Sequence, residues 1–85
     1  MSPSPVVVDA RGHRCPTPSL RLQKAMRGAI QGTRLALLAT DPMARIDVPY
    51  LMDQVGGRLI AIEEIDGVLR ITVETGPARP DAPTG

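Results

Sequence analysis

The sequence predicts an α/β fold of the α+β type, a two-layer sandwich in which two amphipathic helices cover one face of a four-stranded sheet. The first observation behind this prediction is that strand-like and helix-like segments follow one another in the order β-α-β-α-β-β. The second is that 85 residues, 42% of them hydrophobic, suffice for one domain with one small core. Placing both helices on one face is the simplest way to bury that core between two layers.

A short strand and an amphipathic helix are predicted for the first third of the chain. Val6-Val7-Val8-Asp9 is β-branched, which favours a strand. In the loop over residues 10–14, Gly12 allows a tight turn or a positive φ angle. A helix is then expected from about Thr17 to Arg27 or Ile30, because apolar residues recur at helical spacing. The members of this apolar stripe are Leu22, Ala25, Met26, Ala29 and Ile30.

The middle of the chain predicts a buried strand followed by a second helix. The continuous apolar run Leu35–Ala39 indicates a strand that is central or covered on both faces. Thr40-Asp41-Pro42 is typical of a turn, because the residue before a proline avoids helical backbone angles. The second helix is expected to have Asp47 as its N-cap and Pro49 in its first turn, after an irregular or single-turn lead-in over residues 43–46.

A β-hairpin is predicted after Gly56-Gly57, the pair that ends the second helix. Residues 59–65 and 68–75 are two strand-like runs around Asp66-Gly67. This dipeptide suits a type I′ turn, because both central positions of that turn need a positive φ angle. In the last strand apolar and polar residues alternate, so one face is expected to be buried and the other wet.

Residues 6–75 are expected to form a single domain, between a flexible tail over residues 1–5 and a disordered, proline-rich tail over residues 76–85. No apolar run approaches the roughly 18–20 residues of a membrane span, and the N-terminus lacks the pattern of a signal peptide. One cysteine cannot form an internal disulfide, which argues against a secreted scaffold. We therefore expect a cytoplasmic protein without a membrane partner.

The candidate functional residue is Cys15, the only cysteine in the chain. It belongs to Cys15-Pro16-Thr17-Pro18, where the first predicted strand gives way to the first predicted helix. Proline suits a first helical turn, because the amide that it lacks would have no intrahelical partner there. The positive end of a helix favours a thiolate over a thiol, so this position suits a reactive sulfur.

The neighbours of Cys15 favour an exposed thiol over the alternative, a small buried side chain. Arg11, His13 and Arg14 make the preceding loop polar, and such loops are usually exposed. Basic residues outnumber acidic ones in residues 1–40, and this field lowers a thiol pKa and attracts an acidic partner. The charged residues of that segment are Arg11, Arg14, Arg21, Lys24, Arg27 and Arg34 against Asp9. A merely solvated helix face is the alternative explanation of these charges.

A single thiolate can take sulfur from a partner as a persulfide and release it to a third thiol. A dithiol mechanism of the C-x-x-C kind is excluded, because there is no second cysteine. His13, the only histidine, is poorly placed, at two residues from Cys15, to be an oriented general base. It is either a solvent-facing loop residue or a pH-dependent positive charge near the sulfur. One cysteine and one histidine do not make a metal site, and no cofactor is expected. Nucleic acid is not favoured as a partner, because the basic helix lacks aromatic residues for stacking.

Three stretches of the chain resemble the TusA/SirA-like family of small sulfur-carrier proteins. Residues 9–18, DARGHRCPTP, are similar to the family signature D-x-x-G-x-x-C-P-x-P, which contains the CPxP motif. Residues 40–49, TDPMARIDVP, resemble its T-D-P…D-I-P segment. The third stretch is the glycine pair and hairpin from Gly56 to Val73. The resemblance implies a mixed sheet and a sulfurtransferase in which Cys15 bears the persulfide.

The resemblance also implies a cysteine desulfurase or a rhodanese-like protein as the sulfur donor. The implied acceptor is a thiol-bearing protein of tRNA thiolation, sulfur oxidation or related sulfur trafficking. Around Cys15 we expect supporting residues that stabilise the anion or fix the loop, namely Arg11, Gly12, His13, Arg14, Pro16 and Pro18. Arg21 and Lys24 are expected to dock an acidic donor. The alternative is a regulatory or binding module in which Cys15 is structural or redox-sensing, and an RNA-binding module is a weaker third hypothesis.

Overall fold

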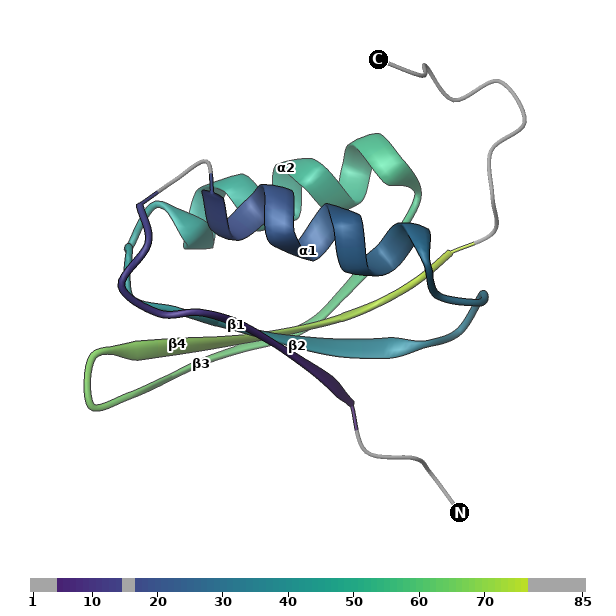
Figure 1. Ribbon diagram of the computed structural model, residues 1–85. Helices are drawn as coiled ribbons and strands as arrows, with labels where there is room; N and C mark the ends of the chain where they lie inside the picture. Colours follow the sequence, from purple (N-terminus) through teal and green to yellow (C-terminus); the bar gives the residue numbers. More distant parts are fainter. Residues whose placement is uncertain (1–4, 15–16, 77–85) are drawn as a thin grey trace.

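The structure of the chain, a computed structural model, describes residues 5–14 and 17–76. Its elements are β1 (Val6–Ala10), α1 (Thr17–Arg27), β2 (Arg34–Ala39), α2 (Ala44–Val55), β3 (Arg58–Ile65) and β4 (Val68–Glu74). The strands form one sheet in the order β1-β2-β4-β3, in which β1 and β2 are parallel and the other neighbours are antiparallel. Both helices lie on the same face of this sheet (Figure 1). The predicted two-layer fold with a mixed sheet is therefore confirmed.

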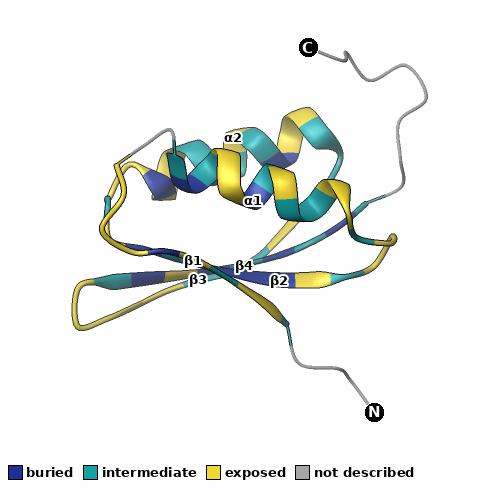
Figure 2. Ribbon diagram, in the orientation of Figure 1, coloured by how far each residue is buried: buried dark blue, intermediate teal, exposed yellow. Residues whose placement is uncertain are grey.

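The core lies between the helices and alternate residues of the two central strands, β2 and β4 (Figure 2). Leu35 pairs with Val73 and Leu37 pairs with Ile71, and all four side chains are buried. Since alternate residues of a strand face the same side, this register directs one apolar row at the helices. The buried apolar side chains that the helices add to this cluster are Leu22, Ala44, Val48 and Met52. The prediction that Leu35–Ala39 is a central strand is confirmed.

The connection after α1 differs from the predicted apolar stripe. Arg27 is the last helical residue, Gly28 follows it, and the Ile30 side chain is 81% exposed. The Ile30 carbonyl oxygen accepts hydrogen bonds from the backbone N–H of Thr33 at 3.2 Å and from its Oγ1 at 2.7 Å. Glycine weakens the last helical turn, and these hydrogen bonds stabilise a turn in its place. The assignment of Ile30 to the buried face of the helix is therefore wrong.

The second helix begins upstream of its predicted start. α2 starts at Ala44 instead of after Asp47, and Pro49 lies inside it. The backbone N–H groups of residues 44–46 each donate to the carbonyl oxygen three positions earlier, at 3.0–3.1 Å. The helix therefore grows from the Asp41-Pro42 turn, and the ring of Pro49 removes one hydrogen bond of the i→i−4 series. The prediction of Asp47 as the N-cap is wrong: Met43 holds that position, and residues 44–46 belong to the first turn of α2 instead of a separate lead-in.

The hairpin of β3 and β4 forms as predicted. Asp66 and Gly67 have φ angles of 52° and 78°, so both central residues of the turn have a positive φ. At the end of α2, Gly56 adopts a left-handed conformation with φ 75°. Its N–H donates to the Met52 carbonyl oxygen, which ends the helix where the sequence predicts.

The loops after β1 and β2 meet at one edge of the sheet. Ala10 and Ala39 are paired at the ends of these two parallel strands. Each strand is followed by a helix that runs back across the sheet, so α1 and α2 begin at the same edge (Figure 1). Residues 11–14 and 40–43, which follow β1 and β2, therefore come from different parts of the sequence to the same place.

Residues 1–4 and 77–85 lie outside the described residues, and the two predicted tails fall mostly on them. Their flexibility stays a prediction. Neither helix of the described ranges is long and apolar enough to cross a membrane.

Candidate functional site

The candidate site lies at the edge where the helices begin. Cys15 and Pro16 are outside the described residues, and Arg14 and Thr17 flank them in the chain. The Thr17 N–H donates a hydrogen bond of 3.0 Å to the Arg14 carbonyl oxygen. Thr17 is also the first residue of α1. The described residues on either side of the Cys15-Pro16 pair are thus held together beside the positive end of a helix.

The loop before Cys15 opens with a tight turn at Gly12. The His13 N–H donates to the Ala10 carbonyl oxygen at 3.2 Å, and Gly12 has a φ angle of 82°. A positive φ at the third position of a turn is the requirement of a type II turn, which glycine meets at little steric cost. The turn's own hydrogen bond leaves the Gly12 N–H for another partner. Thr40 supplies it, because its Oγ1 accepts a hydrogen bond of 2.9 Å from this N–H.

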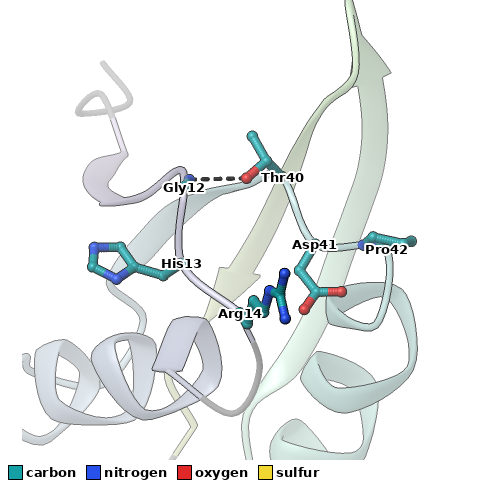
Figure 3. A pocket seen from close by; sticks show the side chains of 6 residues that line it. All are labelled: Gly12, His13, Arg14, Thr40, Asp41 and Pro42. Atoms are coloured by element: carbon teal, nitrogen blue, oxygen red, sulfur yellow. Dashed lines mark hydrogen bonds between the residues drawn. The ribbon is translucent and has the colours of Figure 1, made fainter.

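An open hollow of about 330 Å³ lies between the two loops (Figure 3). The residues that line it are Gly12, His13, Arg14, Thr40, Asp41 and Pro42. The side chains of Arg14 and Asp41 point toward the space between the loops, whereas the His13 ring points to the other side of its loop (Figure 3). His13 and Arg14 are both exposed. A partner as large as a protein can therefore reach this edge.

Asp41 orders the second loop of the hollow. Its Oδ1 accepts a hydrogen bond of 3.0 Å from the Met43 N–H, and its carbonyl oxygen accepts one of 3.1 Å from the Ala44 N–H. These bonds form the turn from which α2 grows. From the sequence, Thr40-Asp41-Pro42 is predicted to be a turn, and none of the three is among the candidate site residues. The available signal was their position directly after a strand, since neighbouring parallel strands end at the same edge.

Arg11 forms a bidentate ion pair with Asp9. Its Nε and Nη2 each donate a hydrogen bond of 2.9 Å to the carboxylate, and its backbone N–H donates one of 3.1 Å. These hydrogen bonds lower the pKa of the Asp9 carboxyl to about 2, and Asp9 raises the pKa of Arg11. Asp9 therefore compensates much of the charge of Arg11, and Arg14 is the loop arginine that lines the hollow.

Arg21 and Lys24, the predicted docking residues, are exposed on α1 beside the edge strand β1. Arg21 Nη1 donates a hydrogen bond of 3.3 Å to the Asp9 carbonyl oxygen. A second open hollow, of about 690 Å³, is lined by Val8, Asp9, Arg21, Lys24, Ala25 and Gly28. Pro18, in contrast, is buried in the first turn of α1 and attaches the start of that helix to the core.

Comparison with known proteins assigns the chain to a family. Residues 6–75 match the family model described as sulfurtransferase TusA, and this segment contains both loops of the hollow. The chain belongs to the TusA sulfurtransferase family. The match confirms the resemblance found in the sequence.

Individual relatives agree with this assignment. A candidate sulfur carrier protein of Archaeoglobus fulgidus is 41% identical over 68 residues, which cover 79% of this chain and 88% of the relative. The sulfur carrier protein TusA of Pseudomonas putida is 36% identical over 61 residues, which cover 72% and 76% of the two chains. The fold is similar to the crystal structure of a SirA-like protein from Desulfitobacterium hafniense, with a TM-score of 0.73 and 25% identity. That likeness covers 85% of this chain and 99% of the other.

Proposed function

We propose that this chain is a sulfur carrier that receives sulfane sulfur as a persulfide on Cys15 and passes it to the thiol of an acceptor. The observation that carries the proposal is the position of the only cysteine in a TusA-family chain. Cys15 directly follows Arg14, which lines the open hollow, and comes two residues before α1 begins. This position suits a sulfur that two other proteins must reach in turn.

Each transfer is a thiol–disulfide-type displacement that balances without an oxidant or a cofactor. In loading, the Cys15 thiolate attacks the terminal sulfur of the donor's persulfide. A new S–S bond forms on Cys15, the donor's S–S bond breaks, and the donor leaves as a thiolate. In delivery, the acceptor's thiolate attacks the terminal sulfur on Cys15, and Cys15 leaves as a thiolate.

The chain stabilises the anion at both stages. The thiolate and the persulfide each carry a negative charge, which the positive end of α1 and the Arg14 guanidinium favour. Gly12 supplies the turn that brings the loop to this edge, and a protonated His13 would add positive charge. Pro16 and the buried Pro18 restrict the entry into α1.

Arg21 and Lys24 would attract an acidic surface of a cysteine desulfurase or a rhodanese-like donor. Both are exposed and line the hollow beside β1, so a partner can contact them directly. Such exposed charges mainly raise the association rate, and salt screens their effect. A lone thiol carrier also requires a reducing compartment, which fits the cytoplasm.

The test is intact-mass spectrometry of the wild-type chain and of Cys15→Ser. Each would be incubated with a cysteine desulfurase and cysteine, or with a rhodanese and thiosulfate, without reductant. We expect the wild type to gain one sulfur, which a reducing agent removes, and the variant to gain none. Absence of any gain with both donors would contradict the proposal and favour a regulatory or binding module.

A further inference from the structure

The hydrogen bond between Gly12 and Thr40 connects the loop of the predicted nucleophile to a different part of the chain. The two residues are 28 positions apart, and Thr40 follows the end of β2. The Gly12 amide lies inside the loop, beyond the last pair of strand residues, Ala10 and Ala39. The bond is 2.9 Å long and is formed by a side chain, so substitution can remove it without changing the backbone.

We propose that Thr40 is a positioning residue for sulfur transfer, which acts by holding Gly12 and thereby the loop that carries Cys15. This inference rests on the function proposed above. In the described part of the loop, four backbone N–H groups donate hydrogen bonds: Arg11 to the Asp9 carboxylate, His13 to Ala10, Thr17 to Arg14, and Gly12 to the Thr40 hydroxyl. The first three are local. The fourth fixes the loop relative to β2 and the start of α2.

Sulfur transfer requires the loop that carries Cys15 to be held in a defined position, because the reaction has a strict geometry. A thiolate displaces a sulfur in line with the S–S bond that breaks, and a partner docked on the surface determines the direction of that bond. A small error in the placement of a reacting atom slows a reaction strongly. Gly12 is three residues before Cys15, so a shift of its amide is passed to the nucleophile through a short piece of chain.

Thr40 contributes more to this placement than to stability. It is exposed, so water can satisfy the Gly12 N–H when the hydroxyl is removed. The net loss of stability from an exposed hydrogen bond is therefore small. The loop would remain folded but would be free to move relative to β2.

The decisive experiment compares Thr40→Val, Thr40→Ser and Thr75→Val with the wild type. Thr40→Val keeps the shape and removes the hydroxyl, and Thr40→Ser keeps the hydroxyl. Thr75→Val makes the same change at a buried threonine on the opposite side of the fold, where its hydroxyl binds Ile30 and Thr33. Single-turnover loading from a persulfidated rhodanese would be measured alongside alkylation of Cys15 by iodoacetamide and amide exchange at Gly12.

We expect Thr40→Val to load about three- to tenfold more slowly, in the range of one lost hydrogen bond, with faster exchange of the Gly12 amide. Alkylation should stay within about twofold, because a small reagent can approach from many directions. Thr40→Ser should restore loading, and Thr75→Val should load normally although it is less stable. Loading of Thr40→Val at the wild-type rate, or failure of Thr40→Ser to restore it, would overturn the role of Thr40. If the wild type itself gains no sulfur, the proposed function fails as well.

Discussion

The two ends of the sheet are held together in different ways. At the end opposite the candidate site, Thr75 is only 6% exposed and joins β4 to the turn between α1 and β2. Its hydroxyl donates to the Ile30 carbonyl oxygen at 2.6 Å and accepts from the Thr33 N–H at 2.9 Å. Its backbone N–H and carbonyl oxygen bond Thr33 and Gly32, each at 2.9 Å. The site end has exposed loops, which the Gly12–Thr40 hydrogen bond connects.

The end of the sheet with Thr75 also contains a close contact between two glycines. Gly76 follows Thr75, and a Cβ at this position would overlap the carbonyl oxygen of Gly56. The chain is therefore closely packed where Gly76 meets Gly56. Local stability in proteins is uneven, and segments that bind partners belong to its lower range. In this fold the end with Thr75 is buried and held by several hydrogen bonds, whereas the end with the candidate site is exposed.

The largest expected effect is on the free energy of unfolding, when threonine is replaced by valine at one end of the sheet and, in a second variant, at the other end. Thr75→Val removes two hydrogen bonds from a buried position, so the free energy of unfolding should fall by about 2 kcal/mol. Thr40→Val removes one from an exposed position and should cost less than about 1 kcal/mol. Urea unfolding followed by circular dichroism measures both values. Equal losses at the two positions would show that the site end is as firmly held as the other.

A second pair of variants compares the two ends of the sheet at glycines with similar φ angles. Gly12 and Gly32 have φ angles of 82° and 86°, and neither has an atom within 4 Å of an added Cβ. Alanine at either position should therefore cost about 1 kcal/mol through its left-handed conformation alone. Only Gly12→Ala should also slow the loading of Cys15, because only this turn leads to the candidate site. If Gly32→Ala slows loading equally, the effect comes from stability and not from the loop.

A smaller effect is expected from the charge beside the thiol. Arg14 lines the hollow next to Cys15 in the chain, so Arg14→Gln should raise the thiol pKa and slow alkylation near neutral pH about two- to fivefold. Arg27→Gln removes the same charge from the last residue of α1 and is the matched control. Iodoacetamide rates measured against pH, at low and high salt, separate the two variants. An equal change in both would indicate the net charge of the chain instead of a local field.

The sequence predicts the parts of the structure that depend on local preferences of the residues. The core strands and the hairpin follow from residues whose preferences are local, such as the apolar run Leu35–Ala39 and the Asp66-Gly67 turn. The start of α2 does not follow from local preferences. Because proline usually avoids a helix interior, the sequence predicts that the helix begins just before Pro49, although the turn at Asp41-Pro42 also suits a helix start. In the structure that turn supplies carbonyl partners for the first helical amides, and the helix continues through Pro49.

The sequence likewise predicts only part of the candidate site. The CPxP motif indicates Cys15 directly, and its chain neighbours follow from it. Thr40 lies at the site because β1 pairs in parallel with β2. The pattern of elements in the sequence does not determine the strand order, so it does not place Thr40 beside Gly12. The pairing of Arg11 with Asp9 was also not predicted, because the sequence shows the charges but not which of them compensate one another.

The smallest expected effect concerns that pair and depends on pH. Asp9 has a pKa lowered from 3.8 to about 2, mainly by the Arg11 side chain, so folding favours its ionised form. Its contribution to stability is therefore present above about pH 4 and is lost as the pH falls toward 2. It should be small, because both side chains are about half exposed.

Arg11→Gln tests this directly. The variant should raise the pKa of Asp9 toward its ordinary value, which an NMR titration of the carboxyl carbon measures. Arg34→Gln is the control, since it breaks an ion pair with Glu74 at the end of the sheet away from the site. If Asp9 keeps its low pKa in Arg11→Gln, the helical Arg21, which donates to the Asp9 carbonyl oxygen, supplies the compensating charge instead. In that case Arg11 would be available to the anion on Cys15, and the loop would carry two effective positive charges.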